Sequence, residues 1–106
     1  MYYIYVLRCS DNSLYTGITN DFKKRYETHF SKNSKAAKYT RSRQVVGVTA
    51  VWETENKSHA LKLEIRIKKL SKDKKEFLVK NPTKIHDFLD VSAQIYQYAD
   101  ANKLLK

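Results

Sequence analysis

The sequence predicts an α/β layer fold, in which a small, mainly antiparallel sheet of three strands is flanked by helices. The first observation is the order of its apolar patterns, which alternate between strand and helix periodicity as β-β-α-β-α-α. The second is the near absence of chain breakers, because only two glycines and one proline occur among 106 residues. The third is an apolar content of 42%, which is enough for one packed core at this length.

The first two strands form a predicted hairpin. Residues 2–9 alternate in the manner of a strand, and Tyr3 and Tyr5 share one of its faces. Residues 10–13 combine Ser, Asp and Asn, which satisfy their own backbone in turns. Residues 14–18 then return as the second strand.

A helix is expected next, because residues 19–21 supply N-cap chemistry, and it should end near Phe30. Arg25 and His29 are four residues apart and therefore neighbours on its surface. A guanidinium fork suits phosphate, and a histidine can titrate near neutral pH. The alternative is structural, with Arg25 stacked on Tyr26 and a histidine that is simply hydrogen-bonded.

Residues 31–43 read as a basic loop in which cations and an aromatic ring are mixed. Such a mixture suits phosphate contacts and base stacking, although a flexible basic loop explains it equally well. The candidate nucleic-acid-binding residues are Lys35, Lys38, Tyr39, Arg41 and Arg43.

The remaining elements follow from local patterns. Residues 45–54 are a valine-rich strand, and residues 58–70 a helix with an apolar stripe. Ser71 can cap a further helix to residue 80, and Pro82 then breaks the chain. Residues 84–105 are expected to form a terminal helix or a pair of helices.

The net charge is concentrated in one part of the chain. Residues 1–82 hold 18 Lys/Arg against 8 Asp/Glu, whereas residues 83–106 hold three of each. This boundary predicts a basic domain over 1–82 and a neutral helical extension over 83–106 packed on it. A positive field of this kind attracts polyanions and favours binding to nucleic acid, and a solvated lysine-rich surface is the alternative explanation.

Several classes of protein are excluded or disfavoured by composition. No apolar run approaches the roughly 20 residues of a membrane span, and the N-terminal residues lack the pattern of a signal peptide. The single cysteine, Cys9, excludes an intrachain disulfide and a cysteine-based zinc site. A cytoplasmic protein is expected.

Glu64 is an unusual residue for its position on the second long helix. It lies at the margin of the apolar stripe, where an unpaired carboxylate is costly. It therefore needs a cation, a hydrogen-bond donor or water. A salt bridge to Lys68 or Arg25 is the structural explanation, and a metal ion is the functional one.

These residues occur in an order that resembles the GIY-YIG nuclease domain, especially its small stand-alone bacterial members. That domain has two short strand motifs, an Arg and a His four residues apart on a helix, and a later helical Glu. The matching positions span about residues 2–82 and are Tyr3-Ile4-Tyr5, Tyr15-Thr16-Gly17, Arg25, His29 and Glu64.

The resemblance implies an endonuclease that depends on a divalent metal, Mg²⁺ or Mn²⁺, and acts on DNA in repair or processing. Glu64 would be the metal ligand, and Tyr5 the general base that activates water. Arg25 would hold the scissile phosphate and offset its developing charge.

The remaining positions of the resemblance have supporting roles. Tyr15 and His29 would orient water and phosphate or shuttle a proton, and Gly17 would allow a close approach of the backbone. Two positions depart from the family motifs, because Tyr3 replaces a glycine and Thr16 an isoleucine. Tyr3 could narrow the pocket, but neither change removes a reacting group.

These residues are compatible with two functions. The first is the endonuclease, which requires Glu64, Arg25, Tyr5, Tyr15 and His29 to converge. The second is a nucleic-acid-binding module that keeps the scaffold but turns over slowly or not at all. A protein partner is compatible with either function, and the sequence indicates none.

Overall fold

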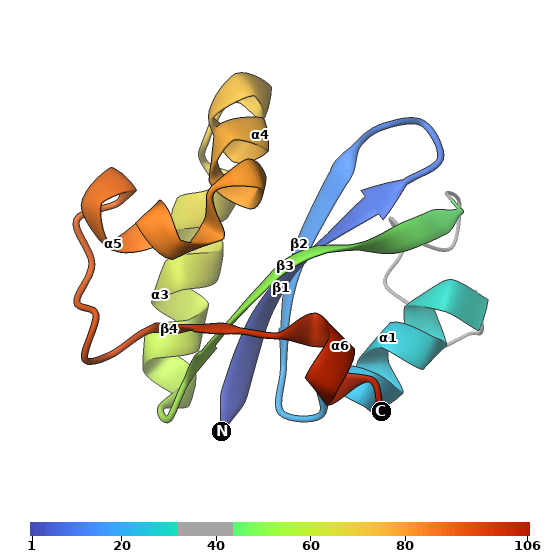
Figure 1. The fold of residues 1–106 in the computed structure, drawn as a ribbon, viewed down its shortest axis with the longest axis horizontal. Helices are drawn as coiled ribbons and strands as arrows, with labels where there is room; N and C mark the ends of the chain where they lie inside the picture. The colour runs from blue at the N-terminus through green and yellow to red at the C-terminus, as the bar shows by residue number, and fades with distance from the viewer. Residues whose placement is uncertain (32–43) are drawn as a thin grey trace.

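The computed structural model describes residues 1–31 and 44–106 and contains one sheet between two groups of helices (Figure 1). The first part of the chain forms β1 (Tyr2–Cys9), β2 (Leu14–Thr19), α1 (Phe22–Ser31), β3 (Val45–Thr54) and α3 (Lys57–Lys68). The second part forms α4 (Lys72–Lys80), η1 (Pro82–Lys84), α5 (Ile85–Phe88), β4 (Gln97–Ala99) and α6 (Ala101–Leu104).

The sheet has the order β2-β1-β3-β4, and every neighbouring pair is antiparallel. An antiparallel sheet flanked by helices confirms the predicted fold class. The predicted number of three strands is wrong, because β4 adds a fourth. β4 is three residues long and pairs with β3 through Val51, Trp52 and Glu53. A strand this short has too little periodicity to be recognised from its own sequence.

The end of the chain also differs from the terminal helix or helix pair that the sequence predicts. The helical pieces α5 and α6 have four residues each, and β4 lies between them. Asp90 ends the first piece in the left-handed region, with φ 53°. The apolar residues that predicted a longer helix are instead buried from separate short segments, as Leu89 and Tyr96 are.

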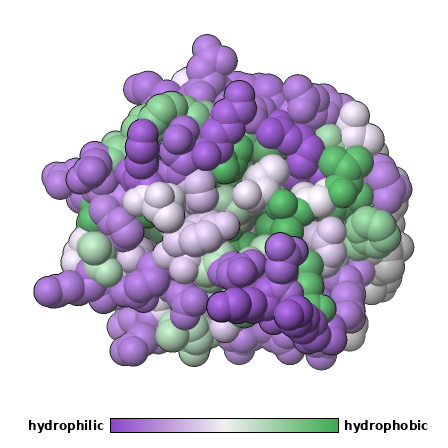
Figure 2. Space-filling model, in the orientation of Figure 1, coloured by the Kyte–Doolittle hydropathy of each residue, from purple (hydrophilic) through white to green (hydrophobic). Residues whose placement is uncertain are grey.

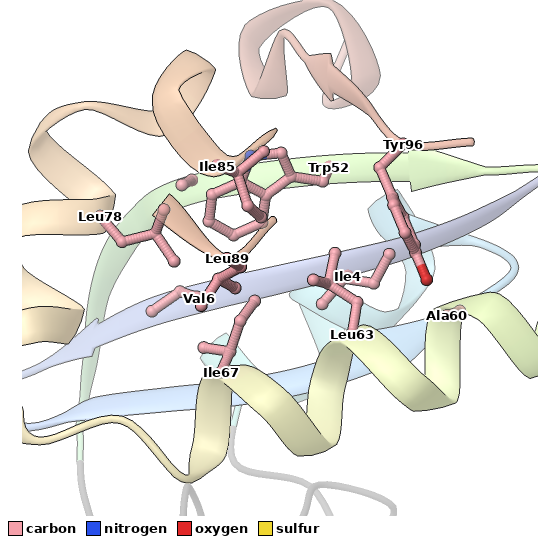
Figure 3. Close-up of a cluster of buried hydrophobic side chains, with 11 residues drawn as sticks. Ile4, Val6, Trp52, Ala60, Leu63, Ile67, Leu78, Ile85, Leu89 and Tyr96 are labelled. Carbon is pink, nitrogen blue, oxygen red and sulfur yellow. The ribbon is translucent and has the colours of Figure 1, made fainter. Parts of the chain in front are cut away.

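Both faces of the sheet are covered, which explains why four consecutive residues of β1, Ile4 to Leu7, are buried. Ile4 and Val6 point to the face covered by α3, α4 and α5. Tyr5 and Leu7 point to the face covered by α1 and α6. The larger cluster, drawn in Figure 3, joins strand residues to Leu63, Ile67, Leu78, Ile85, Leu89 and Tyr96.

Local signals at the turns and caps are observed where the sequence predicts them. Asn12 adopts φ 66° in the β1–β2 turn, and the Ser13 amide donates to Asp11 Oδ1 at 3.0 Å. The Ser71 side chain accepts from the Lys74 amide at the start of α4. The hairpin and this cap are therefore confirmed predictions.

The surface is largely hydrophilic on the face drawn in Figure 2, with hydrophobic patches between the polar side chains. Among the described residues, no helix is long and apolar enough to cross a membrane.

Candidate functional site

The candidate site begins with the pairing of β1 and β2. Tyr5 lies directly opposite Gly17 in the strand register, and its ring extends over the glycine. A Cβ atom at position 17 would lie 2.5 Å from the Tyr5 hydroxyl oxygen and 2.7 Å from Cζ. Glycine is therefore needed here for a close approach, as the resemblance implied. The Tyr5 hydroxyl is thereby directed across the edge strand β2.

Helix α1 supplies the partners of this hydroxyl. The Tyr5 hydroxyl forms a buried hydrogen bond of 2.9 Å with His29 Nε2, and the His29 side chain is fully buried. The Arg25 guanidinium also lies close enough to Tyr5 to oppose the rise in the pKa of the Tyr5 phenol. Because a guanidinium only donates, the Tyr5 oxygen is the acceptor on the side of Arg25, and the Tyr5 proton is available to His29.

Aromatic rings hold Tyr5 in place on several sides. The Tyr15 ring centroid lies 6.3 Å from that of Tyr5 and 5.2 Å from that of His29. The Phe22 ring lies 5.6 Å from Tyr5 and is buried with it. Phe22 is a positioning residue that the sequence argument did not select. The signal was available, since Phe22 lies on the same face of α1 as Arg25.

Burial and charge shift both titratable partners toward their neutral forms. Burial raises the pKa of the Tyr5 phenol above its ordinary value, and nearby Tyr15 raises it further. Burial, with a smaller contribution from the Arg25 charge, lowers the pKa of His29 to about 4. At neutral pH the pair is therefore a neutral phenol and a neutral imidazole.

Glu64 approaches from the helix on the other side of the sheet. Helix α3 packs on β1 and β2, and the Glu64 carboxylate is close enough to influence the pKa of Tyr5 electrostatically. Its side chain is 15% exposed and pairs with Lys68 at 3.4 Å. This ion pair is one of the two that the structural explanation named.

The residues present fit a metal ion held by a single protein carboxylate. Within residues 1–31 and 44–106, no group of three or more His, Cys, Asp or Glu side chains could hold a metal. Glu64 offers hard oxygen atoms and is partly accessible, which suits Mg²⁺ with water completing its coordination.

The sequence also selected Tyr3 and a set of nucleic-acid-binding residues. Tyr3 lies on the same strand face but borders a small hollow near the start of α1, together with Asn20, Phe22 and Leu104. The predicted nucleic-acid-binding residues lie outside the described residues, and their role stays a prediction. They are Lys35, Lys38, Tyr39, Arg41 and Arg43.

The sequence of this chain is similar to a known family of catalytic domains. The family model of the GIY-YIG catalytic domain matches residues 1–76 of the chain. The chain belongs to the GIY-YIG family. The resemblance on which the two motifs and the three helical residues were selected is thus confirmed at the level of the family. The match extends from β1 into α4 and ends at Glu76.

Relatives of this GIY-YIG protein occur among small bacterial proteins named UPF0213. One from Fusobacterium nucleatum is 48% identical over 81 residues, which cover 76% of this chain and 79% of the relative. One from Bacillus velezensis is 47% identical over 75 residues, which cover 71% and 74%.

The fold is also found in a solved relative. The solution NMR structure of the UPF0213 protein BH0048 from Bacillus halodurans has a TM-score of 0.51 and 39% identity. The comparison covers 84% of this chain and 94% of that one. The family is one of nucleases, so nucleic acid is the class of substrate that membership implies.

Proposed function

We propose that this GIY-YIG protein is a divalent-metal-dependent endonuclease that hydrolyses phosphodiester bonds in DNA. The observation that carries the proposal is the buried hydrogen bond of 2.9 Å between the Tyr5 hydroxyl and His29 Nε2, with Arg25 beside it. Such a pair can take a proton from an attacking water while a cation holds the phosphate. Action in the cytoplasm, in DNA repair or processing, belongs to the same proposal.

In the proposed reaction, a water molecule attacks the phosphorus atom. Its proton passes to the Tyr5 oxygen as the Tyr5 hydroxyl proton moves to His29 Nε2. The bond from phosphorus to the leaving oxygen breaks, and that oxygen takes a proton from solvent. Tyr5 remains neutral throughout, which suits a phenol whose pKa is raised by burial. Tyr15, next to both rings, would orient the water.

Arg25 would couple substrate binding to the basicity of His29. Its positive charge is one cause of the lowered pKa of His29. A phosphate bound to Arg25 would offset that charge and raise the pKa of His29 when substrate is present. The same guanidinium would stabilise the negative charge that develops on the phosphate oxygens.

Glu64 would hold the divalent ion, which supplies Lewis-acid stabilisation of the phosphate when bound. Glu64 forms an ion pair with Lys68, which is half-exposed and lies four residues later on the same helix. Pairs of this kind contribute only about 0.3–0.5 kcal/mol. A divalent cation can therefore displace Lys68 from the carboxylate at little cost.

The proposal is tested by cleavage of labelled single-stranded, duplex and branched DNA, and of RNA, with Mg²⁺, Mn²⁺ or EDTA. Glu64→Gln removes the charge of the proposed ligand, and Glu55→Gln removes one from an exposed glutamate in the turn before α3. We expect wild type and Glu55→Gln to cut DNA in either metal. Glu64→Gln should be slower by at least about a hundredfold.

Other outcomes would replace the proposal. Salt-dependent binding of DNA without metal-dependent cutting by wild type would favour the binding module. Cutting that persists in a folded Glu64→Gln variant would remove Glu64 from the metal site. Preference for RNA would keep the chemistry and change the substrate.

A further inference from the structure

An aromatic hollow lies between α4 and α5, outside the cluster around Tyr5. Its volume is about 380 Å³, and it is lined by Phe77, Lys84, Asp87 and Phe88. The two phenyl rings lie with centroids 5.1 Å apart and planes at 37°. This volume falls within the range of small-molecule sites. We name these four residues the α4–α5 platform.

Phe77 does not serve the hydrophobic core. It is 42% exposed, whereas its neighbour Leu78 is fully buried beneath α4. Figure 2 shows hydrophobic surface among hydrophilic side chains on the α4–α5 side of the molecule. The platform also begins one residue beyond the match to the catalytic domain, which ends at Glu76. The Phe77 ring therefore contacts Phe88 but is not part of the buried cluster, and it lies outside the matched domain.

The surroundings of the platform are strongly basic. Residues 68–84 contain seven lysines but only two acidic residues, Asp73 and Glu76. Lys74 and Lys80 are exposed three residues before and after Phe77, and Lys84 Nζ lies 5.9 Å from the centre of the Phe77 ring. An exposed aromatic ring among cations is the composition that binds single-stranded nucleic acid, through stacking and phosphate contacts.

Helix α4 links the platform to the candidate site. A second hollow, of about 210 Å³, is lined by Ser13, Leu14, Lys72 and Lys75, between the β1–β2 hairpin and the first half of α4. Leu14 packs on the sheet face covered by α3 and α4, whereas the next residue, Tyr15, packs with Tyr5 on the other face. Because β2 is an edge strand, a nucleic-acid strand that passes around this edge from the Tyr5–His29 cluster could follow the lysines of α4 to the platform at its other end.

We propose that the α4–α5 platform stacks an unpaired base of a single-stranded segment in the nucleic-acid substrate. This inference rests on the proposed function, and it assigns the substrate a single-stranded portion. The base would lie on the exposed ring of Phe77, and Lys84 would move from the ring toward a phosphate. Lysine can do this because its long stem keeps the ammonium in water.

Asp87 favours a base over other occupants of the platform. Its carboxylate can accept a hydrogen bond from an amino or imino group of a base, as Asp and Glu do with cytosine. It would repel a phosphate, so the base would face the hollow and the backbone would face the lysines. An apolar peptide side chain would leave both the carboxylate and the lysines unused.

The test measures binding by fluorescence anisotropy in EDTA, which prevents metal-dependent cleavage. The probes are a labelled oligothymidylate, the same backbone with abasic sites, and a duplex of equal length. Phe77→Leu removes the ring but keeps an apolar side chain, and Phe77→Trp keeps an aromatic ring. Tyr98→Leu is the matched control, because Tyr98 is 44% exposed on β4 and does not line the platform.

We expect Phe77→Leu to weaken binding of the oligothymidylate by about tenfold, and Phe77→Trp to restore it. Binding of the abasic probe and of the duplex should be unchanged, as should every affinity of Tyr98→Leu. The salt dependence should also be unchanged, because no phosphate contact is removed. Quenching of the introduced indole by the oligothymidylate would report stacking directly.

Equal binding of the oligothymidylate by wild type and Phe77→Leu would overturn the inference. Equal weakening of the abasic probe would do so too, because stacking requires a base. The proposed function would survive either result, since it is judged by the Glu64-dependent cleavage of DNA. If the platform had no effect on binding of nucleic acid, a protein partner would become the alternative occupant.

Discussion

At the scale of single residues, the candidate site depends on how one small residue accommodates one large one. Tyr5 and Gly17 face each other across two strands, and the Tyr5 ring occupies the space where a side chain would stand. That displacement brings the Tyr5 hydroxyl to His29, 24 positions away in the sequence. Gly17 therefore allows the Tyr5 hydroxyl to reach His29.

Gly17→Ala should reduce both cleavage and stability. The new methyl group would meet the Tyr5 ring at 2.5–3.1 Å and push it away from His29. We expect a loss of at least about tenfold in activity and about 1–3 kcal/mol in the free energy of unfolding. Gly47→Ala is the matched control, because a Cβ there meets nothing within 4 Å. Cleavage rates and urea titrations of both variants check the prediction, and a fully active Gly17→Ala would contradict it.

His29 should make the stability of the protein depend on pH between about 6.5 and 4. Its pKa is lowered from 6.5 to about 4, so the unfolded chain binds a proton in this interval and the native state does not. The free energy of unfolding should therefore fall by up to about 3 kcal/mol as the pH drops through it. Urea titrations at several pH values should show a shallower fall for His29→Gln, and an unchanged slope would argue against this origin.

At the scale of elements, a salt bridge fastens the hairpin to α4. Arg8 Nη1 and Nη2 donate to the two carboxylate oxygens of Glu76 at 2.5 and 2.7 Å. Lys72 joins Glu76 at 3.3 Å and donates to the Asn12 carbonyl in the hairpin turn. A bidentate guanidinium pair has fixed geometry, so it sets the position of α4 against the β1–β2 turn.

Glu76→Gln should destabilise the protein at neutral pH by about 1–2 kcal/mol, because the bidentate pair is lost. The hydrogen bond from Arg8, followed by the contact with Lys72, lowers the pKa of Glu76 from 4.5 to about 2. The contribution is therefore complete above pH 4.5 and disappears as the pH falls through about 2.

Thermal unfolding of Glu76→Gln, wild type and Glu55→Gln at pH 7 and pH 2 measures this difference. Glu55 is the control for loss of one carboxylate, since it is exposed in the turn before α3. The stability gap between wild type and Glu76→Gln should close at pH 2. A gap that persists there would mean that packing, and not the ion pair, is responsible.

At the scale of the whole molecule, the last quarter of the chain completes the core that the first three quarters begin. Ile85, Leu89 and Tyr96 belong to the same buried cluster as Ile4 and Trp52 (Figure 3). The match to the GIY-YIG catalytic domain nevertheless ends at residue 76. Residues beyond that match therefore contribute to the stability of the sheet that carries Tyr5.

Ile85→Ala should lower the free energy of unfolding by about 2–5 kcal/mol, because it leaves a cavity in a close-packed cluster. Ile85 is fully buried, whereas Ile65, on α3, is 50% exposed. Ile65→Ala removes the same atoms and should change stability by no more than about 0.5 kcal/mol. Equal effects of the two substitutions in urea titrations would show that the last quarter of the chain is dispensable for the core.

The elements that were predicted correctly are those with a long local pattern. Three such patterns each lie within about ten residues of sequence and are observed: the alternation in β1, the valine-rich β3 and the Ser71 cap of α4. The boundary placed at residue 82 between a basic domain and an extension stays a prediction. The prediction for residues 84–105 was correct only in part, because two helices form there but each has four residues and a strand of three residues lies between them.

The sequence by itself determined the fold class, the strands of the hairpin and the family motifs, because all of these are written in local periodicity and spacing. Only the tertiary structure decided that Tyr5 crosses Gly17 to reach His29, that Phe22 supports this ring, and that β4 joins β3. These contacts join residues far apart in the chain, and their energies depend on burial and on the space between elements. Burial and the space between elements are set only when helices cover both faces of the sheet.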